Sequence, residues 1–141
     1  MLKERMNLGK TAVFPPTYPF KPILLLLALV AIALFPYGWL AEASPLFDRF
    51  LTWIFHTDAA HVVGHAFIFV LLGTAVLKIH PPLRQKPLLY FTIILLLGLA
   101  QESFQLISFK HRWFGMGELL DLSVDMVSAT IVYWIYRIRN A

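Results

Sequence analysis

Cysteine is absent from this sequence and charge is scarce, since only 14% of its 141 residues are Asp, Glu, Lys or Arg. The lack of cysteine excludes disulfides, thiolate-held iron–sulfur clusters and thiol nucleophiles. Hydrophobic residues make up 59% of the chain, whereas soluble domains are about 45–50% apolar and about 25% charged. A soluble fold of this length exposes much of its surface and could not hide so much apolar area. The sequence therefore predicts that lipid surrounds most of the chain.

Several catalytic and cofactor motifs are also absent. The sequence contains no Walker phosphate loop, no dinucleotide-binding glycine pattern, no HExxH zinc motif and no Gly-x-Ser-x-Gly. Its basic residues form no run or stripe of the kind that binds nucleic acid. We therefore expect no nucleic-acid partner and no cofactor other than, at most, a divalent metal ion. No catalytic residue is assigned.

Four long apolar stretches dominate the chain. A transmembrane helix needs about 20 mostly apolar residues to cross about 30 Å of hydrocarbon. The sequence therefore predicts an all-α membrane protein with four transmembrane helices in a single domain, residues 22–141, preceded by the segment 1–21. Pro36 is expected to kink the first span near its outer end. The predicted spans are residues 22–41, 60–79, 87–107 and 119–138.

A shorter apolar segment, residues 45–56, lies between the first two spans. Its apolar side chains cover a broad helical face, and Asp48, Arg49 and Thr52 lie off that face. Twelve residues are too few to cross the membrane. We therefore predict a short interfacial helix that lies in the membrane surface.

The charged residues predict the orientation of the spans. Nine of the twelve Lys and Arg residues fall on the side that holds both termini, and three fall on the other side. Cytoplasmic loops carry the excess of Lys and Arg, so both termini, including the segment 1–21, are predicted to be cytoplasmic. Seven of the eight acidic residues fall on or near the outer half. Acidic residues contribute little to orientation, so their placement needs another explanation.

Polar side chains occur in three of the four predicted spans, although each ionisable group costs roughly 2.5–3.5 kcal/mol at mid-membrane. Because the second and fourth spans enter from outside and the third leaves there, the polar positions fall within a layer of roughly 6–8 Å. We therefore expect one polar pocket under the outer headgroups. Each pair shares a helical face: His61 with His65, Glu102 with Gln105, and Asp121 with Asp125.

Three uses of this polar layer are open. Glu102, Asp121 and Asp125 are suited to hold a divalent metal ion, because carboxylates and imidazoles are metal ligands. The same side chains are equally suited to hydrogen-bond helix to helix and lock the bundle. The loop after the third span carries Arg112, whose guanidinium fork matches a phosphate or an anionic headgroup. Residue spacing does not decide among these uses.

The order of these residues along the chain follows a pattern. The second span contains a stretch that begins with a histidine before an apolar and aromatic run and ends in Leu-Gly (His65 to Gly73). The third span contains Glu-x-x-Gln (Glu102 to Gln105), and Arg112 follows it. The fourth span contains Asp-x-x-x-Asp (Asp121 to Asp125). This order resembles the VanZ-like family, small bacterial membrane proteins named for a member linked to teicoplanin resistance. The sequence departs from the family pattern in three places. Asp125 stands where the family usually has Asn, and Ser128 stands where it usually has Gly. The stretch between Arg112 and Asp121 is a few residues longer than is typical of the family.

The resemblance implies a multi-pass protein of the bacterial cytoplasmic (inner) membrane with a role in the cell envelope or in glycopeptide resistance. The first hypothesis is that its outer-leaflet polar pocket binds a lipid headgroup or a lipid-linked cell-wall precursor. The second is an accessory subunit that contacts other membrane subunits. The third is a metal-dependent lipid-phosphate enzyme. The predicted binding residues are His61, His65, Glu102, Gln105, Arg112, Asp121 and Asp125.

Overall fold

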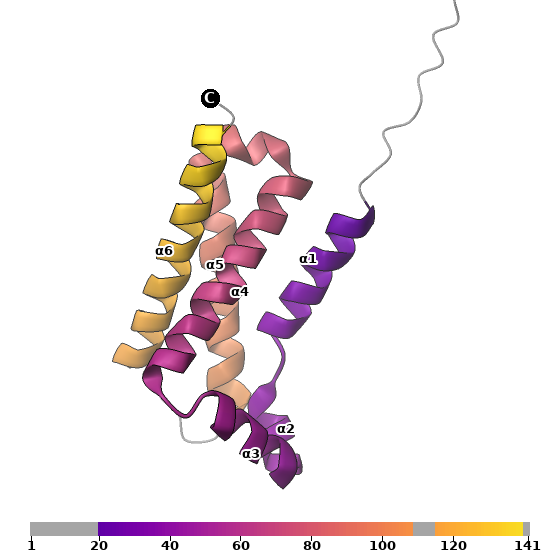
Figure 1. The fold of residues 1–141 in the computed structure, drawn as a ribbon, viewed down its shortest axis with the longest axis vertical. Helices are drawn as coiled ribbons and strands as arrows, with labels where there is room; N and C mark the ends of the chain where they lie inside the picture. The colour runs from indigo at the N-terminus through magenta and orange to yellow at the C-terminus, as the bar shows by residue number, and fades with distance from the viewer. Residues whose placement is uncertain (1–19, 109–114, 140–141) are drawn as a thin grey trace, which may run out of the picture.

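The computed structural model describes residues 20–108 and 115–139, and every secondary-structure element within them is helical. The predicted all-α class is therefore confirmed for this part of the chain. Arg112, one of the predicted binding residues, lies outside the described residues. The elements are α1 (Phe20–Ala33), α2 (Tyr37–Ala43), α3 (Pro45–Ile54), α4 (Asp58–Ile79), the 3₁₀ helix η1 (Pro81–Gln85), α5 (Pro87–Ser108) and α6 (Met116–Arg139) (Figure 1).

Three of these helices, α4, α5 and α6, are each long and apolar enough to cross a membrane. They have 22, 22 and 24 residues, and they begin and end within three residues of the predicted bounds. A fourth span exists if the bent pair formed by α1 and α2 is counted as one. The chain thus has the build of a multi-pass membrane protein, and its number of spans is three or four.

The first predicted span is broken at Pro36. Residues Lys21–Ala33 and Tyr37–Ala43 meet at an angle of 58°. Proline has no N–H, so the carbonyl of Ile32, four residues earlier, loses its helical donor. That carbonyl instead accepts from the Tyr37 hydroxyl at 2.7 Å and, more weakly, from the Phe35 amide at 3.4 Å. The predicted kink at Pro36 is therefore a sharp bend, and its freed backbone acceptor is satisfied by the next residue.

Helix α3 covers most of the segment predicted to be interfacial. Ser44 caps its first turn by accepting a hydrogen bond from the Phe47 amide at 3.4 Å, and Pro45 occupies the first helical position, where a missing N–H costs nothing. Large apolar side chains on it stay exposed, among them Leu46 at 79% and Trp53 at 75%. This surface has the amphipathic composition expected of a helix in the membrane surface, and that location remains a prediction.

The end of the bundle that carries the carboxyl end of α4 is tied together by η1. Arg84 donates from Nε and Nη2 to the Leu77 carbonyl at 3.3 and 3.2 Å, and its guanidinium lies 5.2 Å from the ring centre of Tyr136. Tyr133 donates from its hydroxyl to the Arg84 carbonyl at 2.7 Å. The turn after α4 is thus fixed to α6 by side chains that satisfy its backbone.

Helix α4 packs against α1 and α6, and α6 packs against α5 (Figure 1). The core between them is apolar, with Phe69, Leu72 and Ile94 fully buried. Large apolar side chains also cover the outside of the bundle, such as Phe67 at 64% exposed and Leu96 at 61%. Apolar residues on the outside together with charged residues inside are the pattern of a protein surrounded by lipid.

Tight packing at Gly73 provides a test of the bundle. A Cβ added to Gly73 would lie 2.5 Å from the Tyr90 hydroxyl oxygen, and that fully buried hydroxyl donates to the Ala129 carbonyl at 3.2 Å. Because the ring has no free space, Gly73→Ala should lower the free energy of unfolding by about 1–3 kcal/mol. Denaturant titration in detergent measures this loss. Gly117→Ala is the matched control, since nothing lies within 4 Å of its added Cβ. Equal stability of the two variants would contradict this packing.

Candidate functional site

Buried polar side chains gather near one end of the bundle. That end holds the amino ends of α4 and α6 and the carboxyl end of α5, and α2 and α3 lie beside it (Figure 1). Because all three helices bring their polar residues to within about two turns of this end, side chains distant in sequence meet at one depth. The polar cluster, as we call it below, consists of His61 and His65 from α4, Gln101 and Glu102 from α5, and Asp121 and Asp125 from α6.

The most buried contact in the polar cluster joins His65 to Asp125. His65 Nδ1 lies 3.0 Å from Asp125 Oδ1, and the two side chains are 4% and 0% exposed. A carboxylate only accepts hydrogen bonds, so the imidazole donates from Nδ1–H. The lone pair of His65 Nε2 is then directed to the other side of the ring, away from Asp125. This pair therefore fixes both the tautomer and the orientation of His65.

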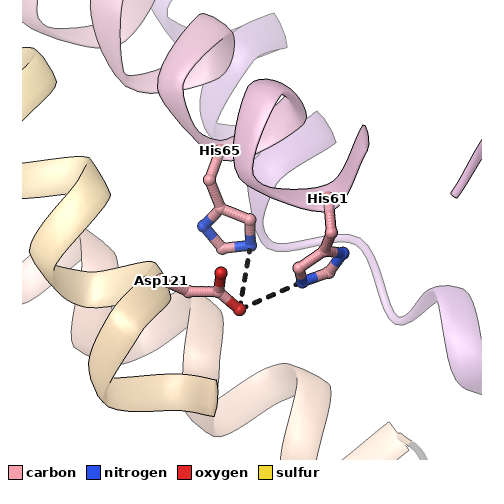
Figure 2. A group of neighbouring side chains, drawn as sticks. All are labelled: His61, His65 and Asp121. Atoms are coloured by element: carbon pink, nitrogen blue, oxygen red, sulfur yellow. Dashed lines mark hydrogen bonds and ion pairs between the residues drawn. The ribbon is translucent and has the colours of Figure 1, made fainter. Parts of the chain in front are cut away.

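Asp121 lies between the two histidines. Its Oδ2 atom is 3.0 Å from His61 Nε2 and 3.8 Å from His65 Nε2 (Figure 2). The ring centres of His61 and His65 lie 4.8 Å apart, and the two residues are one turn apart on α4. The ring of Phe55 packs edge-on against His61 at 5.8 Å. One carboxylate oxygen thus faces both Nε2 atoms, and His61, with its side chain 32% exposed, forms the open edge of the polar cluster.

Glu102 is the least satisfied member of the polar cluster. Its residue is 2% exposed, and within the described residues neither carboxyl oxygen has a hydrogen-bond partner. Oε1 lies 4.0 Å from His65 Nε2, too far for a hydrogen bond. Asp125 Oδ2 and Gln101 Oε1 also lack a partner there. Buried polar atoms are normally paired, so four such acceptors in one place require an explanation.

Among the glutamines of α5, Gln101 takes the place beside His65 that the sequence led us to expect for Gln105. Gln105 is half-buried, and its backbone carbonyl oxygen accepts a hydrogen bond from Ser108 Oγ at 3.2 Å. Gln101, one turn earlier, is 5% exposed, and its amide Nε2 lies 3.4 Å from His65 Nε2. The sequence pattern, which paired Glu102 with Gln105 on one helical face, did not identify Gln101 as a member of the polar cluster. The signal that points to Gln101 is its spacing of three residues after Gly98, where α5 approaches Asp125 closely.

Comparison with known proteins gives no identification. No protein-family model, curated protein or solved structure matches this chain. The resemblance to the VanZ-like family therefore remains a prediction from the residues alone.

The donor atoms of the polar cluster form two sets of the size that holds a metal ion. One set is His61, His65 and Asp121, and the other is His65, Glu102 and Asp125; within each set the atoms lie within 4.8 Å of one another. The predicted set of Glu102, Asp121 and Asp125 is thus divided between two groups that share His65. Imidazole and carboxylate together are ligands for divalent transition metals.

Two hollows described in the structure lie away from the polar cluster. The larger, of about 810 Å³, lies at the opposite end of the bundle and is lined by residues of η1, α6 and Pro87, including Arg84, Tyr133 and Arg137. The smaller, of about 550 Å³, is lined by Leu40, Ser44, Leu46, Phe47 and Phe50 at the corner of α2 and α3. Neither of these two hollows is lined by a residue of the polar cluster, whose most exposed histidine is His61.

Proposed function

We propose that this chain is a VanZ-like protein of the bacterial cytoplasmic membrane that acts in the cell envelope. Both termini face the cytoplasm in this proposal, because nine of twelve basic residues fall on their side. The polar cluster then lies beneath the outer headgroups. Its function is to bind the polar headgroup of a lipid or of a lipid-linked cell-wall precursor.

The observation that supports this proposal is the set of buried acceptors without partners on Glu102, Asp125 and Gln101. A polar group that only locked the helices together would gain most by satisfying every donor and acceptor within the bundle. Glu102 and Asp125 form no hydrogen bond with each other, although Asp125 bonds to His65. Unsatisfied acceptors in this number favour a ligand that supplies donors or positive charge over a purely structural lock.

The position of His61 supports access from the membrane surface. Its side chain is 32% exposed and touches Asp121, which connects it to the buried part of the polar cluster. Lipid headgroups and lipid-linked precursors carry hydroxyl groups and phosphate. The hydroxyls can donate to the carboxylates, whereas a phosphate next to three carboxylates needs a counter-charge. Headgroup hydroxyls are therefore the contact that the side chains can make directly.

Lipid retention tests this proposal. Native mass spectrometry of the purified protein should show a bound lipid when phosphatidylglycerol or a polyprenyl diphosphate is supplied. The lipid that is retained more strongly indicates whether the natural ligand is a membrane phospholipid or a lipid-linked precursor. Asp121→Asn should weaken that binding by about tenfold, or about 1.4 kcal/mol, because it removes the carboxylate at the open edge. Asp48→Asn, at an exposed acid on α3, is the control and should bind as the unchanged protein does. If neither lipid is retained, or if both variants retain it equally, the polar cluster is not a headgroup site.

A further inference from the structure

Several electron-pair donors of the polar cluster lie around His65 Nε2. His65 Nε2 faces Asp121 Oδ2 at 3.8 Å and Glu102 Oε1 at 4.0 Å, because its Nδ1–H is held by Asp125. These separations are too long for direct hydrogen bonds. Gln101 Nε2 at 3.4 Å lies at the limit of a hydrogen bond to the same lone pair. A lone pair and two carboxylates turned toward one another repel, and a metal ion or a proton between them relieves that repulsion.

We propose that the polar cluster binds one divalent transition-metal ion of the zinc class. The ligands are His61 Nε2, His65 Nε2 and Asp121 Oδ2, and Glu102 supplies a fourth. This inference deepens the proposed function. The binding of a headgroup to the ion rests on that function, whereas the binding of the ion itself does not, since side chains alone hold it.

The spacing of the donors fits such an ion. Zinc–nitrogen and zinc–oxygen bonds of about 2.0–2.2 Å in a tetrahedron place neighbouring ligand atoms about 3.3–3.6 Å apart. The separations that involve Asp121 Oδ2 are 3.0 Å to His61 and 3.8 Å to His65, on either side of that value (Figure 2). Glu102 at 4.0 Å from His65 Nε2 is the next donor, and both of its oxygens are buried without a hydrogen-bond partner. His61, His65 and Asp121 already lie within 4.8 Å of one another, whereas Glu102 belongs to the neighbouring set with His65 and Asp125 and joins the ion by a change of its rotamer.

Asp125 has a separate role as a positioning residue. Histidine ligands of zinc commonly donate their second ring N–H to a carboxylate, which fixes the tautomer and raises the basicity of the ligating nitrogen. The 3.0 Å contact between Asp125 Oδ1 and His65 Nδ1 has this arrangement, and Asp125 is fully buried behind the ring. Loss of such a partner costs about 10–100-fold in metal affinity.

An ion in the polar cluster would also reduce the repulsion between its carboxylates and a headgroup that carries a phosphate. The polar cluster holds three carboxylates, and these repel phosphate when no cation is present. A divalent ion offsets two of these charges, and expansion to five ligands on the His61 edge would give it access to a phosphate oxygen. The substrate class that fits is therefore a phospholipid or a polyprenyl phosphate bound through its phosphate.

The experiment uses the full chain in detergent, with any histidine tag removed and without added lipid. After treatment with a chelator, the protein is dialysed against Zn²⁺, and its zinc content is measured by elemental mass spectrometry. We expect one zinc per chain, and a weaker response to Mg²⁺ because imidazole ligands disfavour it. His61→Ala and Asp121→Asn should each lower the zinc affinity at least tenfold. His56→Ala, at an exposed histidine on the same side of the bundle, is the matched control and should leave it unchanged.

Asp125→Asn separates positioning from structure, since an amide oxygen still accepts from His65 but carries no charge. We expect its zinc affinity to fall about 10–100-fold while its unfolding midpoint without zinc stays close to that of the unchanged protein. The proposal is overturned if the unchanged protein holds no stoichiometric zinc, or if His61→Ala and Asp121→Asn retain it as fully as His56→Ala does. Zinc binding without lipid retention would overturn the headgroup function alone, and lipid retention without zinc would overturn the ion alone.

Discussion

Replacing Glu102 with methionine should stabilise the zinc-free protein and remove its response to zinc. Glu102 is 2% exposed, and both of its oxygens lack a hydrogen-bond partner among the described residues. A buried polar group in that state costs about 1–3 kcal/mol. Methionine is flexible and of similar length, so it fills the site without polar atoms. We therefore expect the free energy of unfolding to rise by about 1–3 kcal/mol, measured by denaturant titration in detergent with chelator present.

Glu118→Met is the control for this result. Glu118 lies in the first turn of α6, and its Oε2 accepts a hydrogen bond from the Gly115 amide at 2.8 Å. The same change of residue type there removes a satisfied contact and should not stabilise the protein. A loss of stability at Glu102 would mean that its carboxylate supports the fold, and an equal gain at Glu118 would mean that the gain does not come from the unpaired oxygens of Glu102. Natural sites keep such unfavourable groups where function requires them, so the gain in stability at Glu102 and the loss of metal binding are expected together.

Asp125→Ala should have the opposite effect and a larger one. His65 is 4% exposed and donates to Asp125 Oδ1 at 3.0 Å, so removal of this acceptor leaves a buried N–H unpaired and opens a cavity. Breaking a buried pair of this kind costs about 3 kcal/mol. The measurement is again the free energy of unfolding in detergent, without zinc.

Asp125→Asn is the matched variant, because its amide oxygen keeps the acceptor for His65 Nδ1–H. Most of the lost stability should therefore return in this variant. Asp48→Ala, at an exposed acid, gives the cost of removing a carboxylate that has no buried partner. If Asp125→Ala unfolds at the same denaturant concentration as Asp125→Asn, the contact between α4 and α6 at His65 contributes little to the fold.

The helical spans were predictable because lipid imposes a simple rule on them. Every backbone group must be paired inside the membrane, so long apolar segments form helices whatever their neighbours. The bounds of α4 and the start of α5 follow from Thr57, which caps α4, and from the prolines at Pro81 and Pro87. The sequence also placed Pro36 at a kink. It did not reveal that the bend reaches 58°, because that angle depends on how α2 packs against α3 and α5.

The depth of the polar residues was predictable, and their partners were not. Counting residues from the helix ends places His65, Glu102 and Asp125 at one level, since each residue adds about 1.5 Å. Partner choice depends on the rotation of each helix about its own axis. That rotation turns the polar faces of the three helices toward one another. The position of each helix along its own axis then selects the partners, because residues four apart share a face. It brings Gln101, rather than Gln105, to His65 Nε2, and it pairs Asp125 with His65 and Asp121 with His61.

The bend at Pro36 affects the lipid around the protein. Helix α1 has 14 residues before the break, which at about 1.5 Å each rise only about 21 Å. The hydrocarbon layer is about 30 Å thick, and a bilayer accommodates a short helix by thinning beside it. Because α1 packs directly against α4, this thinning falls next to the helix that carries His61 and His65. If α1 ends within the membrane, we expect a shallower hydrocarbon layer beside these histidines and a shorter path to them from the headgroup region.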